Sequence, residues 1–245
     1  MSIKFIILGS GSSMGVPRVD GYSGNCNLKN KKNFRTRCSA LIKFDNQNFL
    51  IDTSPDLRFQ LLKNNITSIN KVFYTHLHAD QTHGINDLRP FFLINRKKIP
   101  VFADSKTAKY LNSTFNYCFK TSGDYPSVLN LNNLKKKHTF KNKLKKIIIE
   151  AIPTEHGRIE SICYLINKKL AYASDVSLFY QKDHKKLIKL DFLIVDCLWY
   201  KSHSSHYNLD RVLKLVKILS PKKTILTNMH SDLDYDQLKK ILPKN

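Results

Sequence analysis

The chain has 245 residues, 42% of them hydrophobic, so it can bury a core, and this excludes disorder as its overall state. The net charge of +22 fits an anionic partner, although lysine far outnumbers arginine and asparagine is abundant, as base composition alone would produce. Five scattered cysteines form no C-x-x-C pair, and no stretch approaches a membrane span, so we expect a cytoplasmic protein without disulfides or a membrane partner.

Short runs rich in β-branched residues predict buried strands along the whole chain. In chain order they are Ile3–Leu8, Ala40–Phe44, Asn48–Ile51, Lys71–Tyr74, Pro100–Ala103, Ile147–Ile152, Ser161–Ile166, Leu170–Ala173, Phe192–Val195 and Thr224–Leu226.

Helical periodicity falls between several of these runs. Asn208–Leu219 shows it most clearly, with leucine and valine side chains on one face. The other predicted helices are Asp56–Lys63, Ser105–Phe115, Asp183–Leu190 and Asp234–Ile241. Strands separated by helices in both halves predict one α/β domain over residues 1–245.

Two segments are expected to lack regular core structure. Leu134–Lys146 has the densest charge, and we expect it to be a solvated hairpin or loop rather than a domain boundary. Gly9–Gly15 has the spacing G-x-G-x-x-x-G and is followed by Pro17, so it departs from the dinucleotide-binding fingerprint. A glycine-rich turn beside the active site is the interpretation we favour.

Many predicted strands end in a polar side chain that can bind or orient a metal ion. Sheets of α/β proteins place their sites outside the carboxyl ends of strands, so we expect these side chains to meet at one edge. They are Asp52, His76, His156, Asp175, Asp196 and His230.

The run from His76 to His83, HLHADQTH, is the strongest local signal. Alternate residues of an extended segment point the same way, so His76 and His78 can grip one cation while Asp80 reaches a second. Imidazole and carboxylate groups suit Zn²⁺, Mn²⁺ or Fe²⁺. A loop that happens to contain histidines is the alternative, but so many ligand types in so short a run favour metal binding.

His76, His78 and Asp80 form an H-x-H-x-D motif after a strand, and a distant His, an Asp and a last His follow it. This order of residues resembles that of the metallo-β-lactamase superfamily. The segment 74–90 further resembles the branch that contains the cyclic phosphodiesterase of phosphonate operons, as do Gly9–Gly15, Ile51–Asp56 and Leu226–His230. This resemblance covers nearly the whole chain. It implies an αββα sandwich of two mixed sheets flanked by helices, holding one or two divalent ions, Zn or Mn.

The resemblance also implies roles for single residues. The implied ligands are His76, His78 and His156 for the first metal, Asp80 and His230 for the second, and Asp175 as a bridge. Asp52 would orient a ligand imidazole through its other nitrogen. His206 matches a substrate-side histidine, with His203 beside it, and a solvated loop is the alternative for both. Asp196 is either an orienting residue or a turn residue.

Two departures from the family pattern affect these expectations. The superfamily usually has histidine directly after the motif aspartate, but here Gln81 stands there, a weaker and neutral ligand. The second metal is then expected to bind loosely, to be displaced, or to recruit His83. The branch often has a cysteine-rich zinc site near its start, but Cys26 and Cys38 alone are too few for one, so we expect no structural zinc.

Other charged side chains are expected to be structural or solvent-exposed. Arg58 and Arg89 could grip phosphate, but we favour a structural role on their helices. His138 and His184 lie in lysine-rich stretches, so we expect both to be exposed to solvent.

The function that the resemblance implies is hydrolysis of a small cyclic phosphodiester or nucleotide by a metal-activated water, with Asp80 and His206 as catalytic residues. Three alternatives stay open: a nuclease resembling ribonuclease Z, a thioester or lactone hydrolase, and a non-catalytic metal- or nucleotide-binding protein. The expected partner is a small anionic substrate rather than nucleic acid, and a homodimer is compatible with the sequence.

Overall fold

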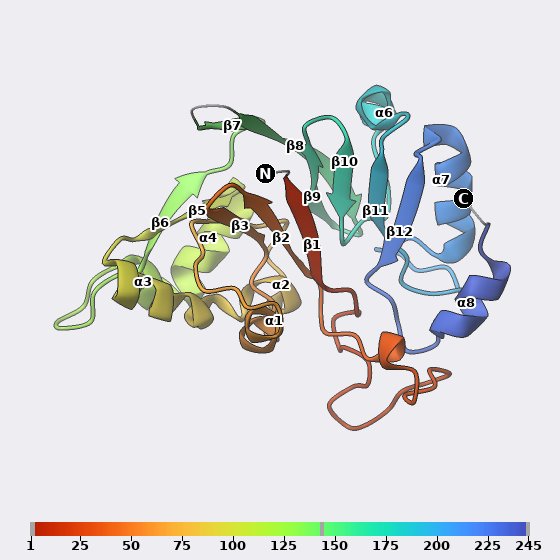
Figure 1. Cartoon of the computed structure of the whole chain (residues 1–245), viewed down its shortest axis with the longest axis horizontal. Helices are drawn as coiled ribbons and strands as arrows, with labels where there is room; N and C mark the ends of the chain where they lie inside the picture. Colours follow the sequence, from red (N-terminus) through yellow and green to blue (C-terminus); the bar gives the residue numbers. More distant parts are fainter. Residues whose placement is uncertain (1–2, 143–144, 244–245) are drawn as a thin grey trace. The chain divides into compact units, whose positions relative to one another are not determined.

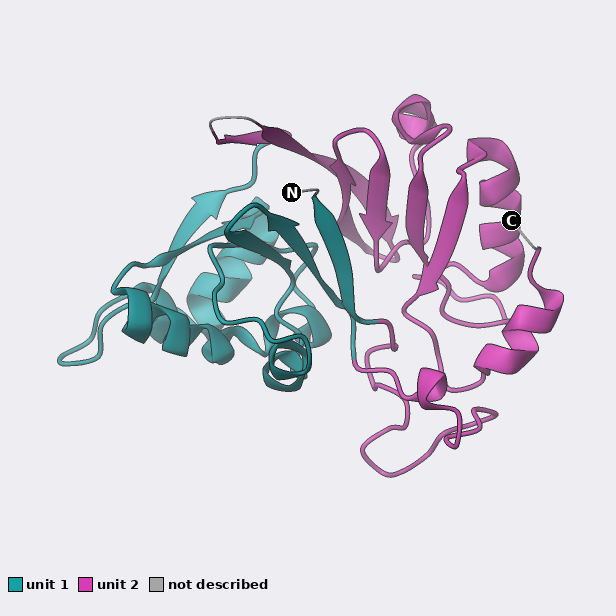
Figure 2. Ribbon diagram, viewed as in Figure 1, with its two compact units in different colours: residues 1–9, 37–135 teal, residues 10–36, 136–245 magenta. Residues whose placement is uncertain are grey.

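The computed structural model describes residues 3–142 and 145–243. The chain divides into two compact units, residues 1–9 with 37–135 and residues 10–36 with 136–245 (Figure 2). Each unit contains one six-stranded sheet with helices beside it (Figure 1).

The sheet of the first unit has the strand order β1-β2-β3-β4-β5-β6. The first three strands pair antiparallel, and β3 to β6 pair parallel. Their bounds are β1 (Lys4–Gly9), β2 (Ser39–Phe44), β3 (Gln47–Ile51), β4 (Lys71–Phe73), β5 (Ile99–Ala103) and β6 (Leu129–Asn133).

The helices of the first unit pack their apolar side chains onto this sheet. Leu57, Phe92 and Leu111 come from three different helices and share one buried cluster with Leu50 and Val101 of the strands. This packing fixes the sheet edge where the site residues emerge. The elements are α1 (Leu57–Lys63), α2 (Ala79–Thr82), η2 (Ile85–Leu88), α3 (Arg89–Asn95), α4 (Ser105–Thr114) and α5 (Asn116–Phe119).

The sheet of the second unit has the strand order β12-β11-β10-β9-β8-β7. β7 to β10 pair antiparallel, and β10 to β12 pair parallel, so β8, β10, β11 and β12 all end at the same edge. Their bounds are β7 (Lys137–Lys141), β8 (Lys146–His156), β9 (Ile159–Ile166), β10 (Leu170–Ala173), β11 (Phe192–Asp196) and β12 (Lys223–Thr227).

Helices of the second unit cover this sheet with an amphipathic face. Val212 and Leu219 of α7 are fully buried with Leu193 and Val195 of β11, as the leucine–valine periodicity predicts. The elements are η1 (Lys31–Asn33), α6 (Gln181–Leu187), α7 (Leu209–Leu219) and α8 (Tyr235–Ile241).

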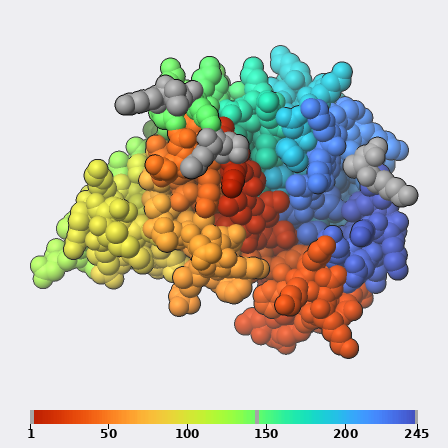
Figure 3. Space-filling model, viewed as in Figure 1, coloured from red at the N-terminus to blue at the C-terminus, as the bar shows by residue number. Residues whose placement is uncertain are grey.

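Residues 10–36 are mostly irregular and lie against the C-terminal segment, orange against blue in Figure 3. The Arg35 guanidinium donates to the Leu233 carbonyl at 2.7 Å, and Asn33 donates to the Asp234 carboxylate at 2.6 Å. Gly11 is required here, since a Cβ at that position would lie 2.6 Å from the Arg35 carbonyl oxygen. These contacts attach the glycine-rich turn to the loop that follows β12.

The predicted fold class is confirmed as two mixed sheets flanked by helices. The expectation of a single domain over residues 1–245 stays a prediction. β6 was not predicted, because its sequence, LNLNN, lacks the usual β-branched residues. The elements η1, α2, η2 and α5 were also missed, since three or four residues are too few to show helical periodicity, and α3 was missed because no capping side chain marks its start.

The hairpin expected within Leu134–Lys146 is present, since β7 pairs with the start of β8, although residues 143–144 lie outside the described residues. Contrary to the expectation that this segment is no boundary, the two compact units divide between residues 135 and 136. The prediction that His138 is solvent-exposed is wrong. His138 is 8% exposed and stacks on Phe140, because strand alternation turns its side chain away from solvent. His184 is half-buried in α6, with Nε2 3.3 Å from the Phe179 carbonyl oxygen.

Among the helices of residues 3–142 and 145–243, none is long and apolar enough to cross a membrane.

Candidate active site

The first group of site residues follows the adjacent parallel strands β3 and β4. Asp52 is fully buried, and its carboxylate accepts hydrogen bonds from the Thr75 backbone at 2.7 Å and the Thr75 hydroxyl at 2.8 Å. The Thr75 hydroxyl lies 3.0 Å from Nδ1 of His76. Asp52 therefore orients the His76 ring through Thr75, a residue that the sequence analysis did not identify.

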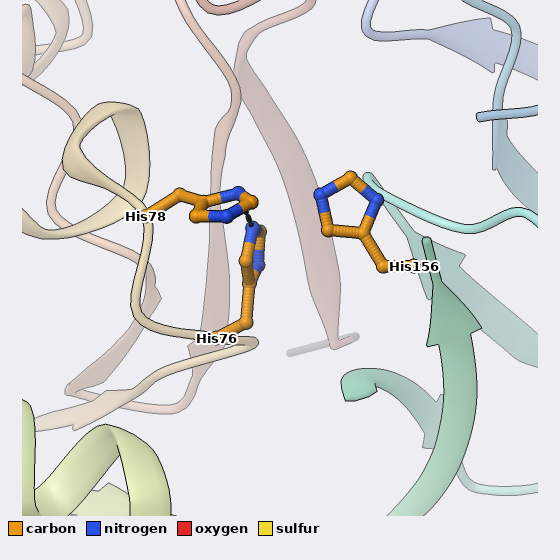
Figure 4. A group of neighbouring side chains, drawn as sticks. All are labelled: His76, His78 and His156. Atoms are coloured by element: carbon orange, nitrogen blue, oxygen red, sulfur yellow. Dashed lines mark hydrogen bonds between the residues drawn. The ribbon is translucent and has the colours of Figure 1, made fainter. Parts of the chain in front are cut away.

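His76 and His78 point their rings at each other (Figure 4). Nε2 of His76 lies 3.0 Å from Nδ1 of His78, and the ring planes meet at 76°. Two imidazole nitrogens aimed at one point are the arrangement that a shared cation requires. The third side chain drawn in Figure 4, His156, belongs to the second unit.

The residues after His78 form the short helix α2. The Gln81 side-chain amide donates to the Asp80 carboxylate at 3.0 Å. Gln81, which stands where the superfamily usually has histidine, thus holds Asp80 in position. His83 is exposed, and its Nε2 lies 3.0 Å from the Tyr110 hydroxyl. The structure therefore places His83 beside α4.

The loop after β3 fixes the position of α2. Thr53 donates from its backbone to the Gln81 carbonyl at 2.7 Å and from its hydroxyl to the Thr82 carbonyl at 3.0 Å. Gly84 lies so close to this loop that a Cβ there would be 2.0 Å from the Ser54 carbonyl oxygen. The motif Asp80–Gln81 is thus held by backbone contacts that only glycine at position 84 permits.

The second group of site residues begins with His156, the last residue of β8. The strand turns there into a tight hairpin with β9. Its Nδ1 donates to the Ser205 carbonyl at 2.6 Å, which makes Nε2 the nitrogen with the lone pair. Burial lowers the pKa of His156 and so favours the neutral imidazole that metals bind.

Three further residues follow the parallel strands β10, β11 and β12 at the same sheet edge. Asp196 Oδ2 accepts from His206 Nδ1 at 2.6 Å, and the Asn228 amide donates to Asp175 Oδ1 at 3.1 Å. Burial, together with the negative charge of Asp175, raises the pKa of Asp196 well above its usual value. Hydrogen bonds from the Val176 backbone N–H and the Asn228 amide lower the pKa of Asp196 and so partly offset this rise.

The ligand atoms of His156, Asp175 and His206 all lie within 4.8 Å of one another. The structure thus brings His206, expected on the substrate side, into the same group as two predicted metal ligands. His203 lies next to it, with a ring-centre distance of 5.1 Å to His206, but it is exposed.

His230 occupies a different part of the second unit's edge. Its ring lies 5.1 Å from that of Trp199, and Nδ1 is 3.6 Å from the Asp232 carboxylate. Asp232 also accepts a hydrogen bond from the Trp199 indole at 2.7 Å. The role of His230 as a ligand of the second metal stays a prediction, as does the full set of ligands from both units.

Both groups of donors fit a divalent cation on the chemistry of their atoms. The first offers two imidazoles, and the second offers two imidazoles and a carboxylate, all nitrogen and oxygen ligands suited to Zn²⁺ or Mn²⁺. Among the described residues, neither group of neighbouring ligands contains a cysteine. Cys26 is buried near the Arg35 guanidinium, and burial raises the pKa of its thiol.

Comparison with known proteins identifies relatives over the whole chain. Residues 47–229 match the model of the family described as "Beta-lactamase superfamily domain". A crystal structure titled as a new diphosphatase from the PhnP family has a TM-score of 0.87 and 30% identity, covering 100% of this chain and 92% of that one. Zinc-bound PqqB from Methylobacterium extorquens, with a TM-score of 0.72 and 14% identity, shares the fold over 98% of this chain and 95% of that one.

Curated relatives are longer than this chain. An octanoyltransferase of Porphyromonas gingivalis is 28% identical over 98% of the chain, but the match spans only 49% of that protein. A ribonuclease Z of Methanococcus maripaludis is 30% identical over 97 residues, which are 38% of the chain and 31% of that enzyme. The chain thus spans half or less of the curated relatives it matches.

The matched family model covers most of the chain, and the diphosphatase structure aligns with all of it. Histidine and aspartate side chains at the strand ends, His156 and Asp175 among them, could hold a metal ion. The chain therefore belongs to the metallo-β-lactamase superfamily, near the PhnP family.

Proposed function

We propose that this protein hydrolyses a small phosphodiester, such as a cyclic nucleotide, with one or two divalent ions, Zn or Mn, as cofactors. The observation that carries the proposal is the His206–Asp196 pair, with a 2.6 Å separation, in the same group as His156 and Asp175. A buried carboxylate paired with a histidine is the arrangement of a general acid that protonates a leaving alkoxide.

The metal ligands proposed are His76, His78, His156, Asp80, Asp175 and His230. When bound, the ions lower the pKa of water and neutralise negative charge on the phosphoryl oxygens. Asp52 and Thr75 orient the His76 ring, and Gln81 holds the carboxylate of Asp80.

The proton transfer falls to His206. Its Nδ1 is engaged by Asp196, whose carboxylate stabilises the protonated ring, so Nε2 is the atom that delivers a proton. As the water oxygen bonds to phosphorus, the bond to the leaving oxygen breaks and that oxygen takes the Nε2 proton. The proton released by the attacking water passes to solvent, from which His206 is protonated again. A general acid of this kind contributes about 10²–10⁴-fold.

Hydrolysis of a diphosphate bond is the second candidate. The solved relative with 30% identity over the whole chain is titled a diphosphatase, and the same residues can protonate a phosphate leaving group. RNA cleavage has weaker support, since the ribonuclease Z matches cover less than half of this chain.

A substrate panel at fixed metal concentration tests the proposal. We expect the highest kcat/KM with a 2′,3′-cyclic nucleotide, compared with a dinucleoside diphosphate, a precursor tRNA and an acyl thioester. Preference for the dinucleoside diphosphate would support the second candidate. Preference for tRNA or the thioester would contradict the proposal. The His206→Ala variant is the control, and it should lose activity on the cyclic nucleotide, whose leaving alkoxide needs a proton.

A further inference from the structure

Asn228 lies one residue beyond the end of β12 and is 1% exposed. Its φ of 58° lies in the left-handed region, which asparagine tolerates better than most residues with a side chain. The Met229 backbone donates to Ser10 at 2.9 Å and accepts from Ser12 at 3.2 Å. The backbone therefore holds the Asn228 carboxamide in one place.

The amide nitrogen of Asn228 lies between the two functional parts of the second unit's site. It donates to Asp175 Oδ1 at 3.1 Å and lies 3.2 Å from Nδ1 of His206. That same Nδ1 is 2.6 Å from the Asp196 carboxylate. An amide group has two hydrogens, so one can serve Asp175 while the other faces the Asp196–His206 pair.

The hydrogen-bond donor at this position stabilises buried negative charge. Asp175 and Asp196 are 3% and 0% exposed, and two carboxylates buried in one site repel each other. An amide between them stabilises both negative charges without adding a charge of its own. Since the Nδ1 proton of His206 is directed to Asp196, the amide also opposes any rotation that would turn this ring toward Asp175.

We propose that Asn228 is a positioning residue that couples the predicted metal ligand Asp175 to the Asp196–His206 pair and keeps Nε2 of His206 aimed at the leaving oxygen. The inference rests on the proposed function, because it assigns a cause to the orientation of the proposed general acid. Asn228 is not itself required to touch the substrate.

The test compares two leaving groups in the variant Asn228→Gly, since glycine keeps the left-handed backbone and removes only the amide. Bis-p-nitrophenyl phosphate expels a stable phenolate that needs no proton, whereas 2′,3′-cyclic AMP expels a ribose alkoxide that does. We expect kcat/KM for the cyclic nucleotide to fall about 10- to 100-fold. For the aryl ester we expect a change of less than about threefold, since this step does not need the acid.

Metal content, measured by elemental analysis, is the readout that does not depend on activity, and we expect it to equal that of the natural protein. Asn65→Gly is the matched control, because Asn65 also has a left-handed φ, of 52°, but is exposed on the first unit. It should change neither substrate's hydrolysis. Equal losses on both substrates, no loss on either, or loss of metal from Asn228→Gly would overturn the inference.

Failure of the proposed function would look different, because the natural protein would then hydrolyse neither phosphodiester with Zn²⁺ or Mn²⁺. Should Asn228→Gly fail to fold by circular dichroism, Asn228→Ala removes the amide without adding a charge. The same selective loss on the cyclic nucleotide is expected from it, and its absence would overturn the inference equally.

Discussion

At the scale of single residues, His206 is the side chain whose removal should separate turnover from metal binding. We expect His206→Ala to lower kcat for a cyclic phosphodiester about 10²–10⁴-fold, because the leaving alkoxide loses its proton donor. Metal content should stay unchanged, which elemental analysis would establish. A possible ligand atom of His206 lies within 4.8 Å of those of His156 and Asp175, so loss of metal from the variant would show that His206 is itself a metal ligand.

His184→Ala is the control for that experiment. This histidine lies on α6, with Nε2 3.3 Å from the Phe179 carbonyl oxygen, and has no place in the proposed chemistry. It should leave both kcat and metal content unchanged, so a comparable loss of activity there would point to a general effect on the fold.

Residue types and spacing predicted the strand-end side chains, because a carboxylate or imidazole directly after an apolar run is conspicuous in the sequence. The residues that orient these side chains could not be predicted in the same way. Thr75 and Asn228 act through neutral hydrogen bonds, and threonine and asparagine are common at strand ends for ordinary turn reasons. Asn228 lies inside the recognised segment Leu226–His230, which is the one signal that could have singled it out.

At the scale of elements, the attachment of α2 to the loop after β3 depends on Gly84. Gly84→Ala should lower the free energy of unfolding by about 1–3 kcal/mol or more, because the new Cβ would lie 2.0 Å from the Ser54 carbonyl oxygen. Chemical denaturation measures the loss. The shift in α2 should also weaken metal binding through Asp80.

Gly123→Ala is the matched control for this prediction. Gly123 has a φ of 53°, and a Cβ added there would meet no atom within 4 Å, so only the cost of the left-handed backbone, about 1–2 kcal/mol, is expected. Equal destabilisation by the two substitutions would show that the close approach at Gly84 is unimportant.

Long elements with strong periodicity were the ones that the sequence predicted well. α7 has apolar residues on one face and an Asn208 cap, and its predicted range agrees with the observed Leu209–Leu219 to within one residue. β6 and α3 could not be predicted in this way. The first pairs through its backbone despite alternating asparagines, and the second begins at Arg89-Pro90 without a capping side chain.

Across the whole molecule, the excess of lysine has two explanations, binding to an anionic partner and base composition alone. Lys168 and Lys169 are exposed in the turn before β10, whereas Asp175 follows the other end of that strand. Between Lys169 and Asp175 lies β10, whose four residues alone span roughly 13 Å at about 3.3 Å per residue. Lysines at this end are too distant to bind a small substrate held by Asp175.

The double variant Lys168→Glu/Lys169→Glu tests this separation. We expect kcat/KM for a cyclic nucleotide to change less than about twofold, since two exposed charges at this distance are screened by salt. Retention of RNA at low salt should weaken, because such binding depends on phosphate contacts. A large loss of turnover would show that the lysine excess serves the substrate.

The proposed phosphodiesterase activity depends on metal held by His76 and His78. Hydrolysis of bis-p-nitrophenyl phosphate by purified protein with added Mn²⁺ or Zn²⁺, alongside the His78→Ala variant, tests it. We expect metal-dependent turnover that is lost in the variant together with bound metal. Turnover that survives in His78→Ala, or no turnover by a natural protein that demonstrably binds metal, would contradict the proposal.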